Sequence, residues 1–398
     1  MQVFINNIVY KFISLIVSVA MLFGYSGECL KADSSNWNTN YKYVFVHGLS
    51  GWGSYDAAYK VMPYWGMFGG DLMKYLNDKG FDCYAASVAP SASAWDRACE
   101  LYAQLTGNVV DYGKAHSKQC GHERYGTDYT GRALIDSFSS EDKINLLGHS
   151  FGGATVRLFA SIMEKGVEDE ISSTPENELS DFFKGGKGDW IYSITALAAP
   201  HNGTSAYMVE KDDMPEEEKP TDSITNDIQY TLSNLIKLAT GGQDDGRSEK
   251  DYASYDMYID NALELNKEIL TLRDAYYFSF PCNATEQKAD GTWSPVEKKM
   301  ESLFVASSKA MGAYTGETKG GYSVDKAWQQ NDGLVNTLSA TAPFGAPQKA
   351  FDINNIEKGI WNVMPTYEGD HMSLQGGMTK PNNVRDFYVE HLSMINSL

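Results

Sequence analysis

Short apolar runs alternate with helical patterns from about residue 41 to the C-terminus. The runs have the length and the β-branched and aromatic content of buried strands. Strands that alternate with helices in this way form a parallel sheet whose faces the helices cover. We therefore expect an α/β protein with a mostly parallel central sheet, as a single domain over residues 40–398. The expected strands are residues 43–46, 81–88, 144–147, 191–198 and 276–280.

Two segments interrupt this alternation. Residues 168–189 are polar and end in a glycine-rich stretch, which is typical of a surface loop. An insertion at about 205–260 has acidic flanks around a helical segment, residues 228–240, in which apolar side chains recur at helical spacing. This helix either docks on the core as ordinary scaffold or forms a lid whose apolar face covers an active site. We expect the lid.

The N-terminus has the layout of a signal peptide. Lys11 precedes an apolar run over residues 12–23, and small and polar residues around Ser26 follow it. We expect a signal peptide over residues 1–32 and a secreted, extracellular protein. A retained membrane anchor is the alternative, although the run is short for a membrane span.

Composition narrows the classes of partner. Of the 398 residues, 42% are apolar and 13% aromatic, which is enough to fill a sizeable core. The formal net charge of −19 would repel a phosphate backbone, so we expect no nucleic-acid partner. No protein partner is implied. Four cysteines beyond the N-terminal segment can form disulfides or stay free in the core, and their spacing leaves both open: Cys83, Cys99, Cys120 and Cys282.

Residues 148–152 read G-H-S-F-G and fit the pattern G-x-S-x-G. The pattern alone is common, but here it follows a short strand pattern and precedes a helical one. A strand-to-helix turn this tight strains the Ser150 backbone and needs small neighbours such as Gly148 and Gly152. It also exposes the hydroxyl and points the helix N-terminus at the reaction centre. We expect Ser150 to be a nucleophile and the Phe151 amide to help hold an oxyanion.

A serine nucleophile needs a base, and the chain has seven histidines. In the α/β-hydrolases, which carry this turn, the base follows both the nucleophile and an intervening acid. Only His201, His371 and His391 follow Ser150. His201 leaves too little chain for the acid. His391 lies in a terminal helical pattern, where we expect it at the surface and its replacement to be nearly silent. His371, in a loop-like stretch near the C-terminus, is the expected base.

The acid and the second oxyanion donor are sought in loops. Asp332 lies at a turn between structured runs and would orient the imidazole of the base. Asp325 and Asp370 remain rivals on sequence grounds. The loop after the first strand offers the Leu49 amide, because Gly48 permits close approach of the backbone.

Longer segments carry a resemblance to a known family. From about Val44 to the C-terminus, the chain resembles the bacterial true lipases that include the thermoalkalophilic zinc-containing lipases and their staphylococcal relatives. The resemblance implies an α/β-hydrolase fold with triacylglycerol lipase or carboxylesterase activity. It also implies a triad of Ser150, Asp332 and His371, with Leu49 and Phe151 as oxyanion donors. The segments that carry it are residues 46–48, 51–53, 77–80, 95–100, 110–113 with His116 and His122, 199–204, 331–336, and 361–362 through 370–371.

The chain departs from the family pattern in several places. Gly148 stands where the family usually has Ala, and Phe151 stands where it has Gln. Backbone donation from residue 151 survives the change, but the pocket shape differs. The lid region aligns poorly, which leaves the acyl-chain preference open. The family's calcium site uses acidic residues shortly after the base, where this chain has Ser373 and Met378, so calcium is not expected.

A metal site follows from the resemblance. Taken alone, Asp96, His116, His122 and Asp251 look like scattered loop residues. The resemblance implies that they hold a structural zinc ion, since two imidazoles and two carboxylates complete a closed tetrahedral shell. Asp256 or Asp260 could replace Asp251, and a site that uses Cys120 in its place also remains open.

Together these features predict a secreted, lipase-like serine hydrolase. It would cleave carboxylic esters, triacylglycerols or related lipid esters at an oil–water or membrane interface, through an acyl-enzyme intermediate. An esterase or phospholipase acting on other esters is one alternative. A non-catalytic secreted binding protein on the same scaffold is another.

Overall fold

The computed structural model describes residues 34–209, 246–379 and 382–398. At its centre is a seven-stranded sheet in the order β13-β14-β7-β6-β5-β1-β2, in which all neighbouring strands are parallel. The sheet confirms the predicted α/β class and all five predicted strands. Its strands are β1 Lys42–Val46, β2 Cys83–Ala86, β5 Ile144–His149, β6 Ile191–Leu197, β7 Tyr276–Phe280, β13 Gln348–Ala350 and β14 Trp361–Val363.

Alternating side chains of the central strands fill the cores on the two sides of the sheet. In β1, Val44 and Val46 join one apolar cluster while Tyr43 and Phe45 join the other. Because strand side chains alternate between faces, a strand buried on both sides is apolar throughout. This explains the continuous apolar runs in the sequence.

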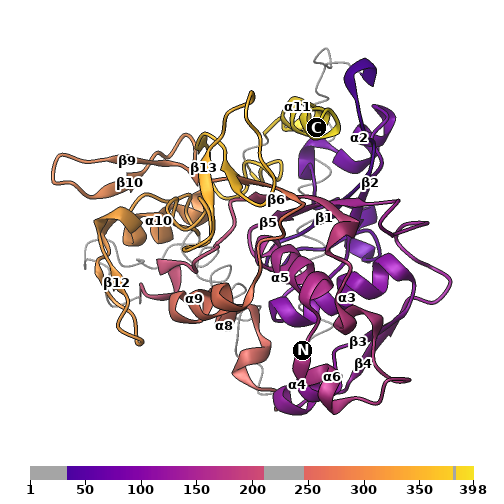
Figure 1. The fold of residues 1–398 in the computed structure, drawn as a ribbon. Coiled ribbons are helices and arrows are strands. Elements are labelled where there is room, and N and C mark those ends of the chain that lie inside the picture. Colours follow the sequence, from indigo (N-terminus) through magenta and orange to yellow (C-terminus); the bar gives the residue numbers. More distant parts are fainter. Residues whose placement is uncertain (1–33, 210–245, 380–381) are drawn as a thin grey trace.

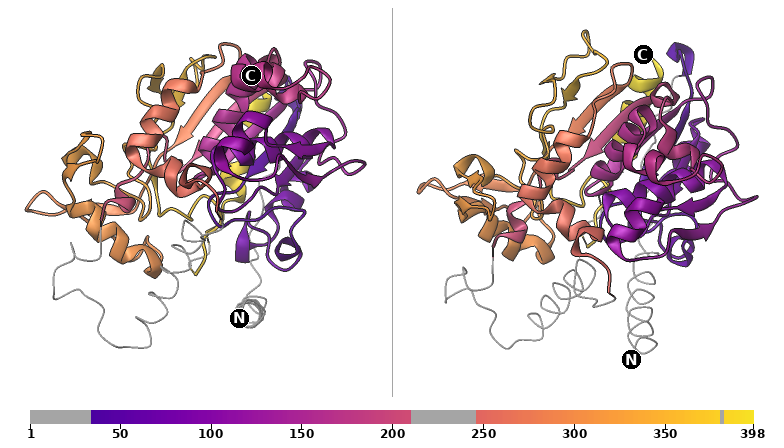
Figure 2. Two further views of the ribbon diagram at one scale, coloured as in Figure 1. Left: turned by 90° about the horizontal axis from the view of Figure 1, so that it is seen from below. Right: turned by 60° about the horizontal axis from the view of Figure 1, so that its bottom comes forward.

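Helices cover both faces of the sheet (Figures 1 and 2). Helices α3 (Ala94–Thr106) and α5 (Gly152–Lys165) supply side chains to the cluster that contains Val44. Helices α2 (Leu72–Asp78) and α11 (Arg385–Asn396) supply the cluster that contains Phe45. The helix that follows β5 is the one predicted after the G-H-S-F-G turn.

Smaller elements surround this core (Figure 1). The two-stranded pairs are β3 Val109–Asp111 with β4 Tyr125–Asp128, β8 Cys282–Asn283 with β15 Tyr367–Glu368, β9 Thr285–Gln287 with β10 Trp293–Pro295, and β11 Gly316–Glu317 with β12 Ser323–Val324. The other α-helices of the described residues are α4 Lys114–Cys120, α6 Glu168–Ser173, α8 Ala253–Met257, α9 Ile259–Glu268 and α10 Val305–Ala313.

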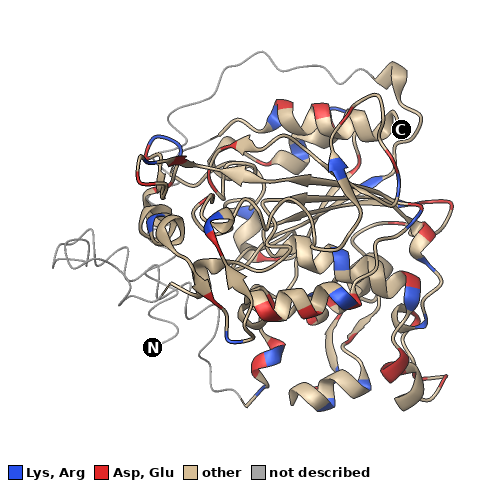
Figure 3. Cartoon of the chain, turned by 60° about the vertical axis from the view of Figure 1, so that its left-hand side comes forward, with Lys and Arg blue, Asp and Glu red and all other residues tan. Residues whose placement is uncertain are grey.

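Charged residues lie mainly on the helices and loops around the sheet, as Figure 3 shows. Of the residues in β1, β5, β6 and β7, Lys42 alone is charged, and it pairs with Asp136 and Asp142. The acidic excess is therefore carried by the periphery and not by these four central strands.

The structure corrects two expectations. Residues 168–189 are not simply a surface loop, because Phe182 and Phe183 of this segment are buried in the core. His391 is not a surface residue. It is buried against β7, and its Nε2 lies 2.9 Å from Thr195 Oγ1 of β6. The imidazole packs against Thr195 and the aromatic side chains of β7. The position of its helix at the C-terminus gave no indication of this burial.

Several expectations fall on residues outside the described ranges. The signal peptide and the lid helix, residues 228–240, are among them. Among the described residues, no helix has the length and apolar character needed to span a bilayer. Cys83, Cys99, Cys120 and Cys282 are all free and buried, so the structure pairs none of these four.

Candidate active site

Ser150 sits on a sharp turn between β5 and α5. Its φ of 55° places it in the left-handed region, which a residue with a side chain seldom occupies. A Cβ on Gly148 would lie 2.4 Å from the Gly152 carbonyl, and one on Gly152 would lie 2.3 Å from the Val46 oxygen. In this structure a Cβ at either position would collide with backbone atoms, which explains the two glycines around the strained serine.

The structure brings Ser150, His371 and Asp332 together. His371 Nε2 lies 2.8 Å from Ser150 Oγ, and His371 Nδ1 lies 2.9 Å from Asp332 Oδ2. The His371 amide also donates to the Asp332 carbonyl at 2.9 Å. All three side chains are buried. The arrangement can pass a proton from a serine hydroxyl to an imidazole that a carboxylate holds in place.

The two rival carboxylates have other partners. Asp370 accepts from the Glu301 and Met372 amides and from the Ser373 hydroxyl. Asp325 accepts from the Ala327 amide at the start of a short helix. Neither therefore contacts the imidazole in the way that Asp332 does.

In the loop after β1, the carbonyl oxygen of the Gly48–Leu49 peptide is held by two side chains. His47 Nδ1 lies 2.8 Å from the Gly48 oxygen, and Arg97 Nη1 lies 3.4 Å from it. The guanidinium of Arg97 also donates to the His47 carbonyl. In a trans peptide the C=O and the N–H point in opposite directions, so a fixed Gly48 oxygen aims the Leu49 N–H the other way.

His47 keeps one tautomer in this loop. Its Nε2 accepts from the Val88 amide at 3.2 Å, so Nδ1 carries the hydrogen that it donates to Gly48. Burial and the nearby Arg97 lower the pKa of His47 to about 3. A neutral imidazole is therefore maintained at neutral pH. Within the described chain, neither Leu49 nor Phe151 uses its amide N–H in a hydrogen bond, which leaves both donors for a ligand.

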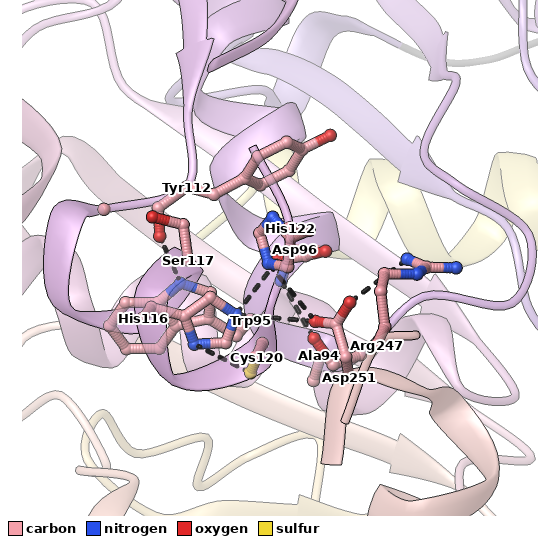
Figure 4. Close-up of polar contacts among 12 residues, drawn as sticks. Ala94, Trp95, Asp96, Tyr112, His116, Ser117, Cys120, His122, Arg247 and Asp251 are labelled. Carbon is pink, nitrogen blue, oxygen red and sulfur yellow. Dashed lines mark hydrogen bonds and ion pairs between the residues drawn. The ribbon is translucent and has the colours of Figure 1, made fainter. Parts of the chain in front are cut away.

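A second group of side chains can hold a metal ion (Figure 4). His116 Nε2 lies 3.1 Å from Asp96 Oδ1 and 3.5 Å from Asp251 Oδ1. His122 Nε2 lies 3.8 and 3.6 Å from the same two oxygens. Neighbouring donors of a tetrahedral zinc shell are about 3.3–3.6 Å apart, given bonds of about 2.0–2.2 Å. The four distances between these imidazole nitrogens and carboxylate oxygens, 3.1 to 3.8 Å, are close to that range.

Unsatisfied polar atoms point into the same space. Within the described residues, His122 Nε2 and Asp251 Oδ1 are buried and have no hydrogen-bond partner. Such atoms cost free energy unless an ion or another group satisfies them. The alternative carboxylates are engaged elsewhere, because Asp256 accepts from the Ala94 amide and Asp260 from the Gly320 amide.

Cys120 lies close to this cluster but on a different side of an imidazole. Its sulfur could join His116, His122 and Asp251 in a set of donors that lie within 4.8 Å of one another. The sulfur, however, lies 3.9 Å from His116 Nδ1, whereas the two carboxylates lie near Nε2. On the Nε2 side of His116 the two nearby carboxylates are therefore those of Asp96 and Asp251, and Cys120 lies at the opposite ring nitrogen.

Local structure brings these ligands together from distant segments. Ser93 caps α3 through the Asp96 amide, and the Ser93 amide donates to the Asp251 carbonyl at 3.0 Å. Helix α4 carries His116 and ends at Gly121, whose φ of 80° turns the chain so that His122 faces back. Trp95 stacks on His116, with ring centroids 4.8 Å apart.

The loop after His371 is held by a carboxylate from outside it. Glu301 Oε1 accepts from the Met378 amide at 2.8 Å, and its Oε2 accepts from the Thr379 hydroxyl. Glu301 is buried, and its own amide donates to Asp370 next to His371. Of the two positions on which the expectation of no calcium rests, Ser373 donates its hydroxyl to Asp370 and Met378 donates its amide to Glu301, so neither supplies an acidic side chain.

Sequence reasoning assigned no role to several residues of this region. Arg97 lies in a segment that carries the family resemblance, which was a signal for its importance. Tyr64 and Glu301 lie in segments with no recognisable pattern, and only the folded chain brings them to the site.

Comparison with known proteins shows which family the chain belongs to. Residues 39–236 and 242–391 match the family described as "Lipase-like, C-terminal domain". The chain is 32% identical to Lipase 1 of Staphylococcus aureus over 359 residues, and 33% identical to the lipase of Staphylococcus hyicus over 364 residues. Each alignment covers 84% of this chain, but only 50% and 53% of the relatives. The chain thus spans about half the length of the curated relatives it matches.

Solved structures give the same result. EstA from Clostridium botulinum superimposes with a TM-score of 0.78 at 31% identity, covering 94% of this chain and 92% of that one. The Staphylococcus hyicus lipase superimposes with a TM-score of 0.73 at 28% identity, covering 93% and 98%. The resemblance drawn from the sequence motifs is therefore confirmed, and the chain belongs to the lipase-like family that includes the staphylococcal lipases.

Proposed function

We propose that the protein is a carboxylic ester hydrolase of the lipase type, with Ser150 as nucleophile, His371 as base and Asp332 as the acid that orients it. The observation that carries the proposal is the pair of contacts to His371: 2.8 Å from Nε2 to Ser150 Oγ and 2.9 Å from Nδ1 to Asp332 Oδ2. These are hydrogen-bond distances, and they give each ring nitrogen its own partner.

The mechanism is acyl transfer. His371 Nε2 takes the proton of Ser150 as Oγ attacks the ester carbonyl, and the imidazolium then gives that proton to the leaving alcohol. The amides of Leu49 and Phe151 hold the oxyanion, aided by the N-terminus of α5. Water, activated by His371, releases the acyl group and regenerates Ser150.

The substrate class we propose is a lipid ester at an oil–water or membrane interface. Support comes from the relatives, whose names identify them as lipases. An esterase or phospholipase acting on other esters is the second candidate. Secretion is also part of the proposal, on the basis of Lys11 and the apolar run that follows it.

We further propose that Asp96, His116, His122 and Asp251 bind a structural zinc ion. Two buried carboxylates and two imidazoles form a donor set that zinc prefers, and four protein donors would complete a tetrahedral shell with no open position for a substrate. The ion would join α3, α4 and the segment before α8, and it would take no part in the chemical step.

Two assays test the enzymatic proposal. A fluorophosphonate should label the wild-type protein at Ser150, and a series of p-nitrophenyl esters of increasing acyl length should be hydrolysed. Ser150→Ala should remove labelling and reduce turnover about a thousandfold or more, because the nucleophile and base act together. A folded wild-type protein that neither reacts nor hydrolyses any ester would instead be a binding protein on this scaffold.

A further inference from the structure

A buried chain of three hydrogen bonds connects the loop after β1 to the loop that carries His371. The Gly48 amide lies 3.2 Å from the Tyr64 hydroxyl, and that hydroxyl lies 2.6 Å from His149 Nδ1. His149 Nε2 then lies 2.8 Å from the His371 carbonyl oxygen. Tyr64 is 4% exposed and His149 is fully buried. None of these contacts involves the reacting atoms.

The two ends of this chain fix its direction. The Gly48 amide can only donate, and the His371 carbonyl can only accept, so His149 Nε2 carries a hydrogen. Burial and the neighbouring His371 lower the pKa of His149 to about 3, which keeps its ring neutral. Nδ1 is therefore an acceptor, and the Tyr64 hydroxyl donates to it while accepting from Gly48. Every donor meets an acceptor, so one arrangement of hydrogens satisfies all three contacts.

The chain joins the parts that must be held together during acyl transfer. Gly48 precedes the expected oxyanion donor Leu49, His149 precedes Ser150, and the third contact is to the backbone of His371. The backbone near residue 64 is also bonded to the segment after His371. The side-chain amide of Gln375 donates to the Tyr64 carbonyl oxygen, and the Gln375 carbonyl oxygen accepts from the Gly66 amide. The hydroxyl of Tyr64 is thus placed from the His371 side and reaches the loop after β1.

We propose that Tyr64 and His149 are positioning residues that set the distance between the oxyanion donor, the nucleophile and the base. This inference rests on the proposed ester hydrolase function. Neither side chain exchanges a proton with substrate. They act through the Gly48 amide and the His371 carbonyl, and misplacing a reacting group by about 1 Å is enough to slow a reaction about a hundredfold.

The test variant is Tyr64→Phe, which removes only the hydroxyl. Its matched control is Tyr277→Phe, because the Tyr277 hydroxyl also accepts from a buried backbone amide, that of Leu272 at 2.9 Å. Tyr277 lies near the start of β7, whereas Ser150 follows the end of β5 in the same parallel sheet. The two residues are therefore near opposite ends of the parallel strands. Measurements are kcat and KM on a soluble p-nitrophenyl ester, the rate of fluorophosphonate labelling, and the melting temperature.

We expect Tyr64→Phe to lower kcat and the labelling rate about ten- to a hundredfold, with KM within about twofold of wild type. Tyr277→Phe should keep both rates even where its melting temperature falls equally. If Tyr64→Phe and wild type have equal rates, the inference is overturned. The proposed function would still stand in that case, because the wild-type protein would be active. Equal loss in both variants would also overturn the inference, since stability alone would then explain the change.

A second pair of variants tests the contact that His149 Nε2 makes with the His371 carbonyl. Gln places an amide N–H near the position of Nε2 and keeps the donor to His371, whereas Phe keeps the ring shape but removes both polar atoms. We expect His149→Gln to retain more kcat than His149→Phe. His391→Gln is the control and should keep the wild-type kcat. His391 is also buried, and its low pKa keeps it neutral, but it lies in α11 and outside this chain of hydrogen bonds. Equal kcat for the two His149 variants would contradict the inference. A wild-type protein without labelling or turnover would remove the proposed function and this inference together.

Discussion

Asp332 divides its carboxylate between His371 and two backbone amides. Oδ2 lies 2.9 Å from His371 Nδ1, while Oδ1 accepts from the Leu334 and Val335 amides at 3.0 and 2.7 Å. The amides hold the carboxylate from behind and leave one oxygen for the imidazole. The turn over residues 331–336 therefore fixes the orientation of Asp332, and Asp332 fixes the tautomer of His371.

This division makes Asp332→Asn a sharp test. The Asn oxygen will stay with the Leu334 and Val335 amides, because its NH₂ group cannot accept from them. The NH₂ group then faces His371 Nδ1 and forces the hydrogen onto Nε2, which can no longer accept the Ser150 proton. We expect kcat to fall about a thousandfold or more, with little change in melting temperature. Asp325→Asn, at a carboxylate that caps a short helix, should leave kcat unchanged. A loss of less than about tenfold in Asp332→Asn would remove Asp332 from the triad.

The sequence predicted the sheet and the arrangement around Ser150 because both depend on local rules. Buried parallel strands are apolar throughout, and the G-x-S-x-G turn needs glycine where a Cβ would meet the backbone. The strands at residues 348–350 and 361–363 were missed, because each is too short to show a period. Asp370 could not be separated from Asp332 in the sequence, since the difference lies in which amides surround each carboxylate.

The burial of His391 could have been predicted from the spacing of apolar residues in its helix. His391 lies three residues after Tyr388 and four before Ile395, and both of these residues are buried. This spacing puts His391 on the inner face of α11. Tyr64 and Glu301 gave no comparable signal, since their partners are distant in the sequence and are brought close only by the tertiary fold.

The burial of His391 predicts a measurable pH dependence of stability. Burial lowers its pKa to about 3 in the folded protein, against about 6.5 in an unfolded chain. Between pH 6.5 and 3 the unfolded chain binds a proton that the folded protein does not, so stability is full above pH 6.5 and falls as the pH drops. One such group contributes about 1.4 kcal/mol per pH unit over this window.

His391→Gln should therefore flatten the fall. The free energy of unfolding, measured by urea titration at intervals from pH 7 to pH 4, should decline in the variant by about 1.4 kcal/mol per unit less than in wild type. His47 and His149 have similarly lowered pKa values and keep their own contributions. Parallel curves for the two proteins would show that His391 is protonated equally in both states. Contrary to the expectation for a surface histidine, some loss of stability at pH 7 is also expected, because a buried ring is removed.

Glu301 should stabilise the loop that follows His371. In Glu301→Gln, one side-chain oxygen is replaced by NH₂, so the variant cannot accept from both Met378 and Thr379. The Gln oxygen then accepts from only one of the two donors, so one hydrogen bond to this buried side chain is lost, and the free energy of unfolding should fall by about 0.5–1.5 kcal/mol. Glu368→Gln is the control, because Glu368 pairs with Lys299 at the surface, where an ion pair contributes little. Equal stability of Glu301→Gln and wild type, measured by urea titration, would mean that the carboxylate does not hold this loop.

Removal of the proposed zinc ion should affect stability far more than chemistry. The purified protein should contain about one equivalent of zinc, and treatment with a strong chelator should lower its melting temperature, because an ion that binds only the folded state stabilises that state. At a temperature well below the new melting point, kcat should remain close to that of the untreated protein, since no zinc ligand contacts Ser150, His371 or Asp332 in the described structure.

Two variants then decide which side chains bind the ion. Asp96→Asn removes a negative charge from the Nε2 side of His116, where the two carboxylates lie, and it should lower the zinc content sharply. Cys120→Ser replaces a sulfur that lies on the Nδ1 side and should keep the zinc. Retention of zinc by Asp96→Asn together with its loss in Cys120→Ser would establish the cysteine-containing site instead. Less than about a tenth of an equivalent of zinc in the wild-type protein, with no change of melting temperature on chelation, would exclude a structural zinc.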